Sequence, residues 1–222
     1  MPATLRSIQE AVRQGGEEFE VIVVDDASTD DTAKIAQAAG ATVVPINRRQ
    51  IAAARNAGAR ASRGEILFFV DADTRINATH VREGILALRK GFSGGSARIL
   101  PEGNIPYWGR FWLRVFCALY FAMKLGAGAF IFTTRQNFEK VGGFDEQYFA
   151  GEEVFLSVAL KKLGKFTILP EPMITSGRKL RMHSGWYLWW RCGRMMLGGL
   201  KSYRSRDQLD LWYDGKREST TT

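Results

Sequence analysis

Short apolar runs alternate with helical segments through residues 1–91, and this alternation limits the folds open to the chain. Continuous apolar runs such as "FEVIVVDD" (19–26) and "EILFFVDA" (65–72) are typical of strands that are covered on both faces. Between them lie segments with helix caps and terminal glycines, such as residues 28–40. Regular alternation of this kind predicts an α/β fold, with a Rossmann-like, mostly parallel sheet flanked by helices.

From residue 92 onward the alternation becomes less regular. Apolar runs over 92–100, 127–135 and 165–170 predict strands, and helical patterns cover 108–126 and 152–164. A basic, aromatic segment predicts a last helix over residues 184–204. Because no internal repeat, low-complexity tract or linker interrupts the 222 residues, we expect a single domain.

The net charge of +8 comes from one part of the sequence. Residues 173–206 contain no acidic residue, and their eight lysines and arginines equal the whole net charge. The same stretch holds Trp186, Trp189 and Trp190. A basic, tryptophan-rich helix suits an anionic surface such as phospholipid headgroups or a diphosphate better than it suits nucleic acid.

The remaining composition indicates a cytoplasmic protein. Cys117 and Cys192 have no metal-type spacing and fit a reducing compartment. The N-terminus lacks the basic-then-apolar layout of a signal peptide. Residues 115–134 have about the length of a membrane span, but Lys124 and two glycines interrupt them. We expect a helix, a loop and a strand inside the core there.

Two carboxylates, Asp71 and Asp73, follow the apolar run of residues 65–70. Side chains alternate along a strand, so the two would lie on the same face of a strand that continued through them. Carboxylates held that close repel each other unless a cation or a proton intervenes. The pattern therefore predicts either a divalent metal site at the carboxyl end of a buried strand or an ordinary solvated turn.

Two further acidic pairs accompany this one. Asp25 and Asp26 follow an apolar strand, and Glu152 and Glu153 open a predicted helix. The carboxyl ends of parallel strands meet at the same edge of a sheet, so we expect the first two pairs to face a common crevice.

A phosphatase of the haloacid-dehalogenase type is an alternative, because such enzymes also place D-x-D after an apolar strand. Their pattern continues D-x-D-x-T/V and usually lies in the first strand. Here Thr74 directly follows Asp73, Arg75 occupies the threonine position, and the motif lies far from the start of the chain. The match to the phosphatase pattern therefore fails by one residue and by its place in the chain.

Four ordered blocks of the sequence resemble family 2 glycosyltransferases with the GT-A fold. They are "VIVVDDASTDDT" (21–32), "ARNAGARASRGEILFFVDADT" (54–74), "GAFIFTTRQNFEKVGGFDE" (128–146) and "EEVFLSVALKKLG" (152–164). The resemblance implies inverting transfer of a sugar from a nucleotide-sugar donor, assisted by Mn²⁺ or Mg²⁺. It makes residues 1–91 a nucleotide-binding half, 92–183 an acceptor half, and 184–222 a basic aromatic helix and tail.

The resemblance also implies roles for the acidic pairs near the donor. Asp26 matches the acid that bonds the nucleobase, and Asp25 is its neighbour. Asp71 and Asp73 match the D-x-D motif at the metal, with Asp73 as the direct ligand and Asp71 nearer the ribose. Arg55 matches a basic residue near the nucleotide, and a solvated helix arginine is the equal alternative.

Glu153 matches the position of the catalytic base, which is usually an aspartate in an "ED" pair. Glu152 stays the second candidate, because the extra methylene of glutamate displaces the carboxylate. An acidic first turn that favours the helix dipole is the structural alternative. His183 loosely matches a further metal or diphosphate contact seen in some relatives, and a structural or surface histidine is the alternative. His80, inside a predicted helix, is interpreted as structural.

The family's first strand has no counterpart before the helix that begins at Pro2. Because that strand is central in the family's sheet, we expect a gap with unpaired backbone groups on both of its neighbours. Otherwise another segment fills the position, or the chain is part of a longer protein. The gap also raises an alternative function, a nucleotide-diphosphate-binding protein without transfer activity.

The implied partners are a nucleotide-sugar donor and an acceptor whose identity stays open. The segment 184–204 predicts either a helix that packs its tryptophans on the core and leaves its arginines in water, or a helix at the bilayer interface. The second alternative implies peripheral association with the inner face of the cell membrane. A lipid-linked acceptor, as in the synthesis of cell envelope polysaccharides, is therefore one candidate. We expect no nucleic acid partner.

Overall fold

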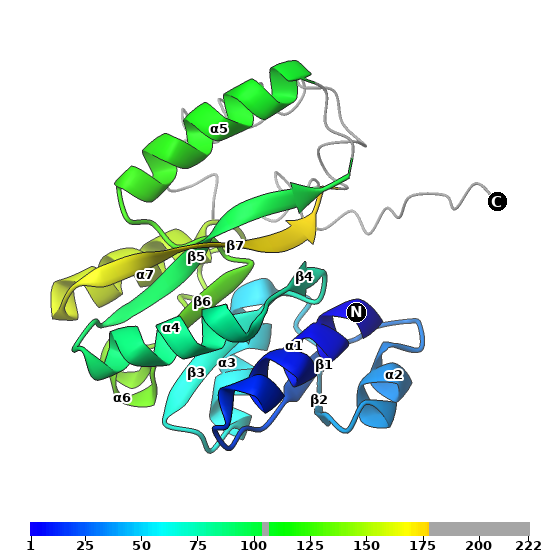
Figure 1. The fold of residues 1–222 in the computed structure, drawn as a ribbon. Helices are drawn as coiled ribbons and strands as arrows, with labels where there is room; N and C mark the ends of the chain where they lie inside the picture. The colour runs from blue at the N-terminus through cyan, green and yellow to red at the C-terminus, as the bar shows by residue number, and fades with distance from the viewer. Residues whose placement is uncertain (104–106, 178–222) are drawn as a thin grey trace.

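The computed structural model describes residues 1–103 and 107–177 as alternating helices and strands (Figure 1). Within these ranges the chain follows the predicted alternation, while the last predicted helix, 184–204, lies outside them. The elements, in chain order, are α1 (Pro2–Gly15), β1 (Ile22–Asp26), α2 (Thr32–Ala38), β2 (Thr42–Ile46), α3 (Ile51–Ala61), β3 (Ile66–Val70), β4 (Thr74–Arg75), α4 (Ala78–Arg89), β5 (Gly94–Glu102), α5 (Tyr107–Ala122), β6 (Phe130–Thr134), α6 (Arg135–Lys140), α7 (Glu152–Leu163) and β7 (Phe166–Ser176).

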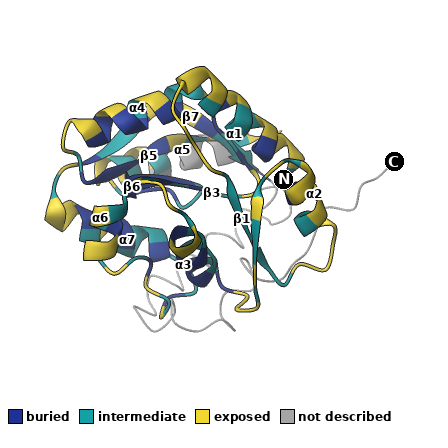
Figure 2. Ribbon diagram, turned by 90° about the horizontal axis from the view of Figure 1, so that it is seen from below, coloured by how far each residue is buried: buried dark blue, intermediate teal, exposed yellow. Residues whose placement is uncertain are grey.

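The strands form two hydrogen-bonded sheets, one of β1 and β2 and one in the order β3-β6-β5-β7-β4. The pairs β1–β2 and β5–β7 are parallel, whereas β6 runs antiparallel to β3 and β5, and β4 runs antiparallel to β7. In this structure the two parallel strand pairs together contain more paired residues than the three antiparallel pairs. Figure 2 shows α1 and α4 on one side of the strands, with α3, α6 and α7 on the other. The α/β fold with helices on both faces is therefore confirmed.

Alternation along β3 and β6 supplies a core on each face of the larger sheet. Phe130 and Phe132 point toward α1 and α4, and Ile131 points toward α6 and α7. In β3, Leu67 and Phe69 join the second of these cores. This is why both strands read as continuous apolar runs: each face of the strand meets a layer of helices.

The two sheets are joined by helices rather than by strand pairing. Among the described residues, β1 pairs only with β2, and β3 pairs only with β6, so the expected interruption of the sheet is present. Helix α3 packs against β1 and β2, and its residues Ala52 and Ala59 pack in the core with Leu67 of β3. Helix α3 is consequently shared by both sheets, and a side chain on it can reach the ends of strands in either.

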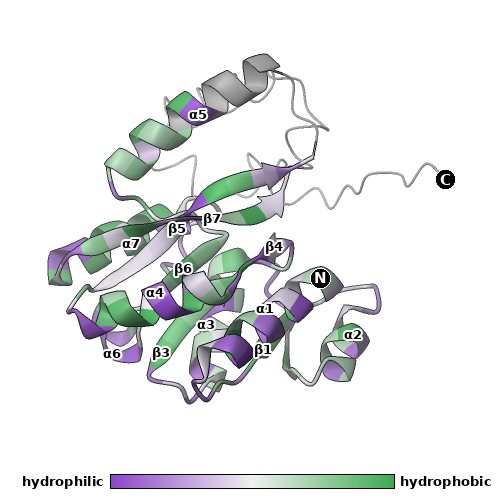
Figure 3. Cartoon of the chain, viewed as in Figure 1, coloured by the Kyte–Doolittle hydropathy of each residue, from purple (hydrophilic) through white to green (hydrophobic). Residues whose placement is uncertain are grey.

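The predicted helix, loop and strand over 115–134 are confirmed, because α5 ends at Ala122 and β6 begins at Phe130. Strand β6 lies in the core as expected, and Phe121 of α5 packs against that core, while other side chains of the segment are exposed. Leu119 and Met123 of that segment are 65% and 58% exposed, and the part of α5 that Figure 3 colours is largely apolar. Across the described ranges, no helix combines the length and the apolar character that crossing a bilayer requires.

Candidate functional site

A buried arginine, Arg55, links three separate parts of the chain. Its side chain is 10% exposed. One guanidinium nitrogen donates to Glu152 Oε1 at 2.6 Å, and the other donates to Asp71 Oδ1 at 2.8 Å and to the Gly128 carbonyl at 2.7 Å. Arg55 therefore connects α3 to the end of β3, the first turn of α7 and the loop before β6. The alternative of a solvated helix arginine is wrong.

Glu153 lies beside this arginine but is not among its hydrogen-bond partners, which are Glu152, Asp71 and Gly128. A Cβ atom built on Gly128 would lie 3.3 Å from Arg55 Nη2 and 3.4 Å from Glu153 Cδ, so both side chains line the same backbone segment. Burial and the neighbouring charge of Glu152 raise the pKa of Glu153 to about 7, against the opposing effect of Arg55. Burial also raises the pKa of Glu152, and the ion pair with Arg55 opposes that rise.

Asp71 and Asp73 lie in a turn and not in a strand. Strand β3 ends at Val70, and the Thr74 amide donates to the Asp71 carbonyl at 3.0 Å. The expectation that strand alternation places the two carboxylates on one face is therefore wrong, because the chain turns directly after β3. Asp71 is held by Arg55 and its side chain is 41% exposed, while Asp73 is exposed at the tip of the turn.

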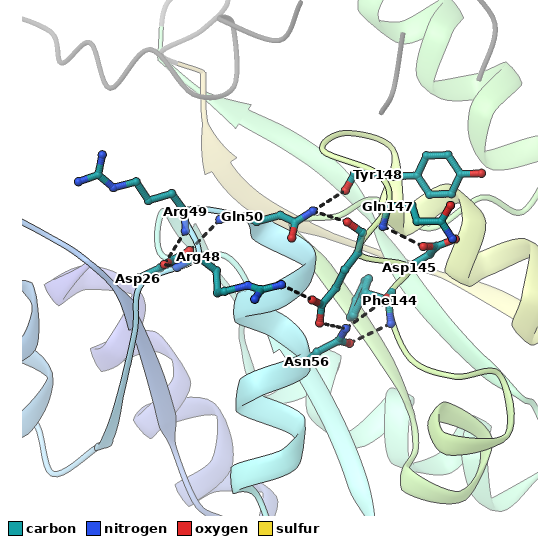
Figure 4. A network of polar contacts seen from close by, with 10 residues as sticks. Asp26, Arg48, Arg49, Gln50, Asn56, Phe144, Asp145, Gln147 and Tyr148 are labelled. Atoms are coloured by element: carbon teal, nitrogen blue, oxygen red, sulfur yellow. Dashed lines mark hydrogen bonds and ion pairs between the residues drawn. The ribbon is translucent and has the colours of Figure 1, made fainter. Parts of the chain in front are cut away.

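Asp26 makes backbone contacts that sequence reasoning missed. Its carboxylate accepts hydrogen bonds from the amides of Arg48, Arg49 and Gln50, at 2.7, 2.7 and 2.8 Å (Figure 4). Asp25 Oδ1 accepts from the Ser28 amide at 3.1 Å. Asp25 thus fixes the turn after β1, and Asp26 fixes the turn after β2. Contact of Asp26 with a nucleobase stays a prediction.

Three polar residues that sequence reasoning did not select tie the loop after α6 to α3. Asn56 bonds both backbone groups of Phe144, at 2.8 and 2.9 Å, and Gln50 donates to the Glu146 carbonyl at 2.6 Å. Glu146 accepts from Asn56 at 3.0 Å. A usable signal was present: Asn56 falls at helical spacing from Ala52 and Ala59, so a polar side chain lies on the buried face of an alanine-rich helix.

Asp71 and Asp73 are the described residues best suited to a divalent cation. Across residues 1–103 and 107–177, no three His, Cys, Asp or Glu side chains come together as a metal cage. Two accessible carboxylates nevertheless fit Mn²⁺ or Mg²⁺, because these cations prefer oxygen ligands and often take the rest from a bound phosphate group and water. His183 lies outside the described residues. His80 is buried and caps α4 together with Asn77, so its structural interpretation is confirmed.

Comparisons with known proteins identify a family for this sequence and similar solved structures for its fold. A family model described as "Glycosyl transferase family 2" matches residues 2–140. The fold is similar to that of a mannosyltransferase from Pyrobaculum calidifontis in complex with GDP-Man and Mn²⁺, with TM-score 0.61 and 20% identity over 87% of this chain and 57% of that one. It is also similar to glucosyl-3-phosphoglycerate synthase from Mycobacterium tuberculosis in complex with Mn²⁺ and UDP-Glc, with TM-score 0.59 and 19% identity over 91% and 75% of the two chains.

A third similar structure is S. aureus TarS 1–349 in complex with UDP, with TM-score 0.58 and 17% identity over 85% of this chain and 60% of that one. A search of curated proteins gave no match. At these identities the likeness concerns the fold. The chain spans less than two thirds of the mannosyltransferase and of TarS 1–349.

Replacing Glu153 with glutamine should make the unfolding free energy less dependent on pH. The pKa of Glu153 is about 7 in the folded chain and 4.5 ordinarily. The folded chain therefore holds this proton more tightly than the unfolded chain, and wild-type stability falls as pH rises from about 4.5 through 7. Glutamine cannot ionise, so we expect Glu153→Gln to be more stable than the wild type at about pH 8. Urea unfolding followed by circular dichroism measures the difference.

The matched control is Glu139→Gln on α6, where the side chain is 65% exposed. This variant should follow the wild-type pH dependence throughout. Parallel curves for Glu153→Gln and the wild type between about pH 4.5 and 8 would show that the Glu153 carboxyl titrates normally.

Proposed function

This chain belongs to glycosyl transferase family 2, and from that premise we propose that it transfers a sugar from a nucleotide-sugar donor to an acceptor hydroxyl. The transfer inverts the anomeric carbon and is assisted by Mn²⁺ or Mg²⁺. One observation carries the proposal: Arg55 holds the acid after β3 and the first acid of α7 around one buried guanidinium, with Glu153 beside them. In this proposal the donor-binding acid and the general base lie at the same edge of the sheet.

The donor belongs at the ends of β1 and β3 in this proposal. Asp73 and Asp71 supply oxygen ligands for the metal, and Asp25 and Asp26 lie at the nucleobase. The bound metal neutralises negative charge on the leaving nucleoside diphosphate. Two similar structures support the choice of a nucleotide-sugar donor and a divalent metal, since one is a complex with GDP-Man and Mn²⁺ and another a complex with Mn²⁺ and UDP-Glc.

The electrostatics favour Glu153 over Glu152 as the base. The Glu152 side chain is 4% exposed and committed to a 2.6 Å ion pair, so it is poorly placed to take a proton from an incoming hydroxyl. Glu153 keeps more solvent-accessible surface than Glu152. Burial of its carboxyl group and the charge of Glu152 raise its pKa to about 7, which suits proton transfer near neutral pH. Two adjacent carboxylates would then have different roles, one that holds Arg55 and one that accepts the proton of the acceptor hydroxyl.

A nucleotide-diphosphate-binding protein without transfer activity is the second candidate. The observation that favours it is the interrupted sheet, because β1 and β3 have one strand partner each among the described residues. The two candidates differ in turnover and not in donor binding. The family assignment leaves the phosphatase alternative without support.

The base is tested by replacing each glutamate in turn with glutamine, which keeps the shape and cannot accept a proton. For Glu153→Gln we expect turnover of a nucleotide-sugar panel to fall by about 10²-fold or more, with donor affinity similar to the wild type. If Glu152→Gln shows that pattern instead, the base is Glu152. If neither variant loses turnover, the inverting mechanism is wrong. If the wild-type protein binds a donor but does not turn it over, the result supports the second candidate.

The metal is tested by binding. Asp73→Ala should abolish the Mn²⁺-dependent binding of UDP or GDP measured by calorimetry, because one oxygen ligand is lost while the diphosphate keeps its charge. The control is Asp31→Ala, which removes a carboxylate that is 71% exposed at the start of α2. Unchanged affinity in Asp73→Ala, or tight wild-type binding that a chelator leaves intact, contradicts the metal site.

Peripheral membrane association is the remaining part of the proposal. The segment 184–204 lies outside the described residues, but α5 offers support of its own. Leu119 and Met123 are exposed one helical turn apart, and Lys161 of α7 donates to the Met123 carbonyl at 2.9 Å, which sets a cation beside them. Exposed apolar side chains next to lysines suit an anionic bilayer surface, where a lipid-linked acceptor would reside.

We therefore expect the protein to sediment with anionic vesicles more than with neutral ones, and salt to weaken that association. The measurement compares phosphatidylglycerol-containing vesicles with pure phosphatidylcholine vesicles at low and high salt. Equal recovery in the supernatant with both kinds at low salt would mean that the acceptor does not reach the site by way of the bilayer.

A further inference from the structure

A set of polar contacts, exposed at Arg48 and Arg49 and buried at Asn56, connects the ends of β1 and β2 to the segment that leads into α7 (Figure 4). We call residues 144–148 the anchored loop. They follow α6 and precede Glu152 by a few residues. The reaction proposed above uses none of the side chains that hold this loop, and their contacts span from 88 to 98 residues along the chain.

The first connection is the turn of residues 48–50, between β2 and α3. The carboxylate of Asp26 accepts all three of its amides, at 2.7 to 2.8 Å. Arg49 has a positive φ of 49°, a conformation that a non-glycine residue adopts only at some cost. The three hydrogen bonds from the turn to Asp26 compensate for that cost. The turn is therefore fixed to the end of β1, where we place the donor.

The side chains of this turn then reach across to the anchored loop. Gln50 is buried, and its Nε2 donates to the Glu146 carbonyl at 2.6 Å and approaches the Tyr148 carbonyl at 3.4 Å. Arg48 Nη2 donates to Glu146 Oε2 at 3.3 Å from a more exposed position. Gln50 thus joins the end of β1 to the anchored loop, because its backbone amide bonds Asp26 and its side chain bonds the Glu146 carbonyl.

Asn56, on the buried face of α3, supplies the second anchor. Its Nδ2 donates to the Phe144 carbonyl at 2.8 Å and to Glu146 Oε1 at 3.0 Å, and its Oδ1 accepts from the Phe144 amide at 2.9 Å. A Cβ atom at Gly143 would lie 2.8 Å from Asn56 Oδ1, and Gly143 has a positive φ of 74°. Only a glycine there lets the loop approach α3 this closely.

The anchored loop packs directly against the first turn of α7. The ring of Tyr148 stacks on Phe155 of α7, with centroids 3.8 Å apart and planes 11° from parallel. Gly151 caps the helix with a positive φ of 73°, and its carbonyl accepts the amide of Val154. A shift of the loop at Tyr148 would therefore move the first turn of α7.

We infer that Gln50 and Asn56 are positioning residues that fix the anchored loop, and through it the first turn of α7, in the place where Glu153 lies beside Gly128. The inference rests on the proposed function as far as Glu153 is the base. Buried amide groups suit this task, because each removes a loop carbonyl from water while keeping it hydrogen-bonded. Their loss leaves carbonyl groups of Phe144, Glu146 or Tyr148 buried without that partner.

Two isosteric variants test the inference. Asn56→Asp keeps the acceptor for the Phe144 amide, removes the donor to the Phe144 carbonyl, and sets a second carboxylate beside Glu146. Gln50→Glu keeps the side-chain length and removes the donor to the Glu146 and Tyr148 carbonyls. In each full-length variant we expect amide hydrogen exchange across residues 144–155 to rise by about 10-fold, the ratio that loss of one buried hydrogen bond produces.

Turnover separates a positioning role from a merely structural one. We expect kcat to fall by about 10-fold in each variant, while the affinity for UDP or GDP with Mn²⁺ stays within about twofold of the wild type. The matched control is Gln147→Ala, an exposed residue of the same loop whose amide, and not its side chain, bonds Asp145. This variant should keep wild-type exchange and kcat.

The two readouts have distinct meanings. Unchanged exchange across 144–155 in both variants overturns the inference whether or not the chain is an enzyme. Faster exchange with unchanged kcat overturns the positioning role. Wild-type protein that turns over no donor in the panel contradicts the proposed function, and exchange at residues 144–155 then decides by itself whether Gln50 and Asn56 fix the first turn of α7.

Discussion

One buried cation sets the arrangement of the whole site. A guanidinium that has left water must have its donors satisfied and its charge balanced, or the cost exceeds what the surrounding core contributes. Arg55 meets this requirement with Asp71, Glu152 and the Gly128 carbonyl, which come from three different parts of the chain. These groups can therefore not move apart independently, and the edge of the sheet near Arg55 behaves as a single unit.

The same cation leaves an excess of negative charge. Asp71, Glu152 and Glu153 outnumber Arg55, and burial keeps water from screening their mutual repulsion. Protonation of Glu153 removes one of these negative charges without breaking an ion pair, because Glu153 has none of its own with Arg55. Glu152 and Glu153 differ because they are consecutive residues of a helix, and consecutive side chains point about 100° apart. Glu152 therefore faces Arg55, and Glu153 faces Gly128.

Local patterns predicted most of the elements, because burial on both faces of β3 and β6 leaves continuous apolar runs in the sequence. They did not predict strand direction in the second half, since an antiparallel β6 has the same composition as a parallel one. The acidic pairs were found because each follows a strand or opens a helix. The helical spacing of Asn56 indicates that its side chain is buried, but not what it binds. Its partners and those of Gln50 were missed, because contacts across almost a hundred residues leave no local pattern.

The separation of the two sheets has a consequence for how this protein opens. Within residues 1–103 and 107–177, strands β1 and β2 form their own hydrogen-bonded pair and share no backbone ladder with the five-stranded sheet. No ladder has to break when the segment β1–α2–β2 loosens, so its opening costs less than opening of β5 and β7, which share a long register. The segment β1–α2–β2 is therefore expected to open before the five-stranded sheet, and a ligand that bridges the two would stabilise that segment far more than the sheet.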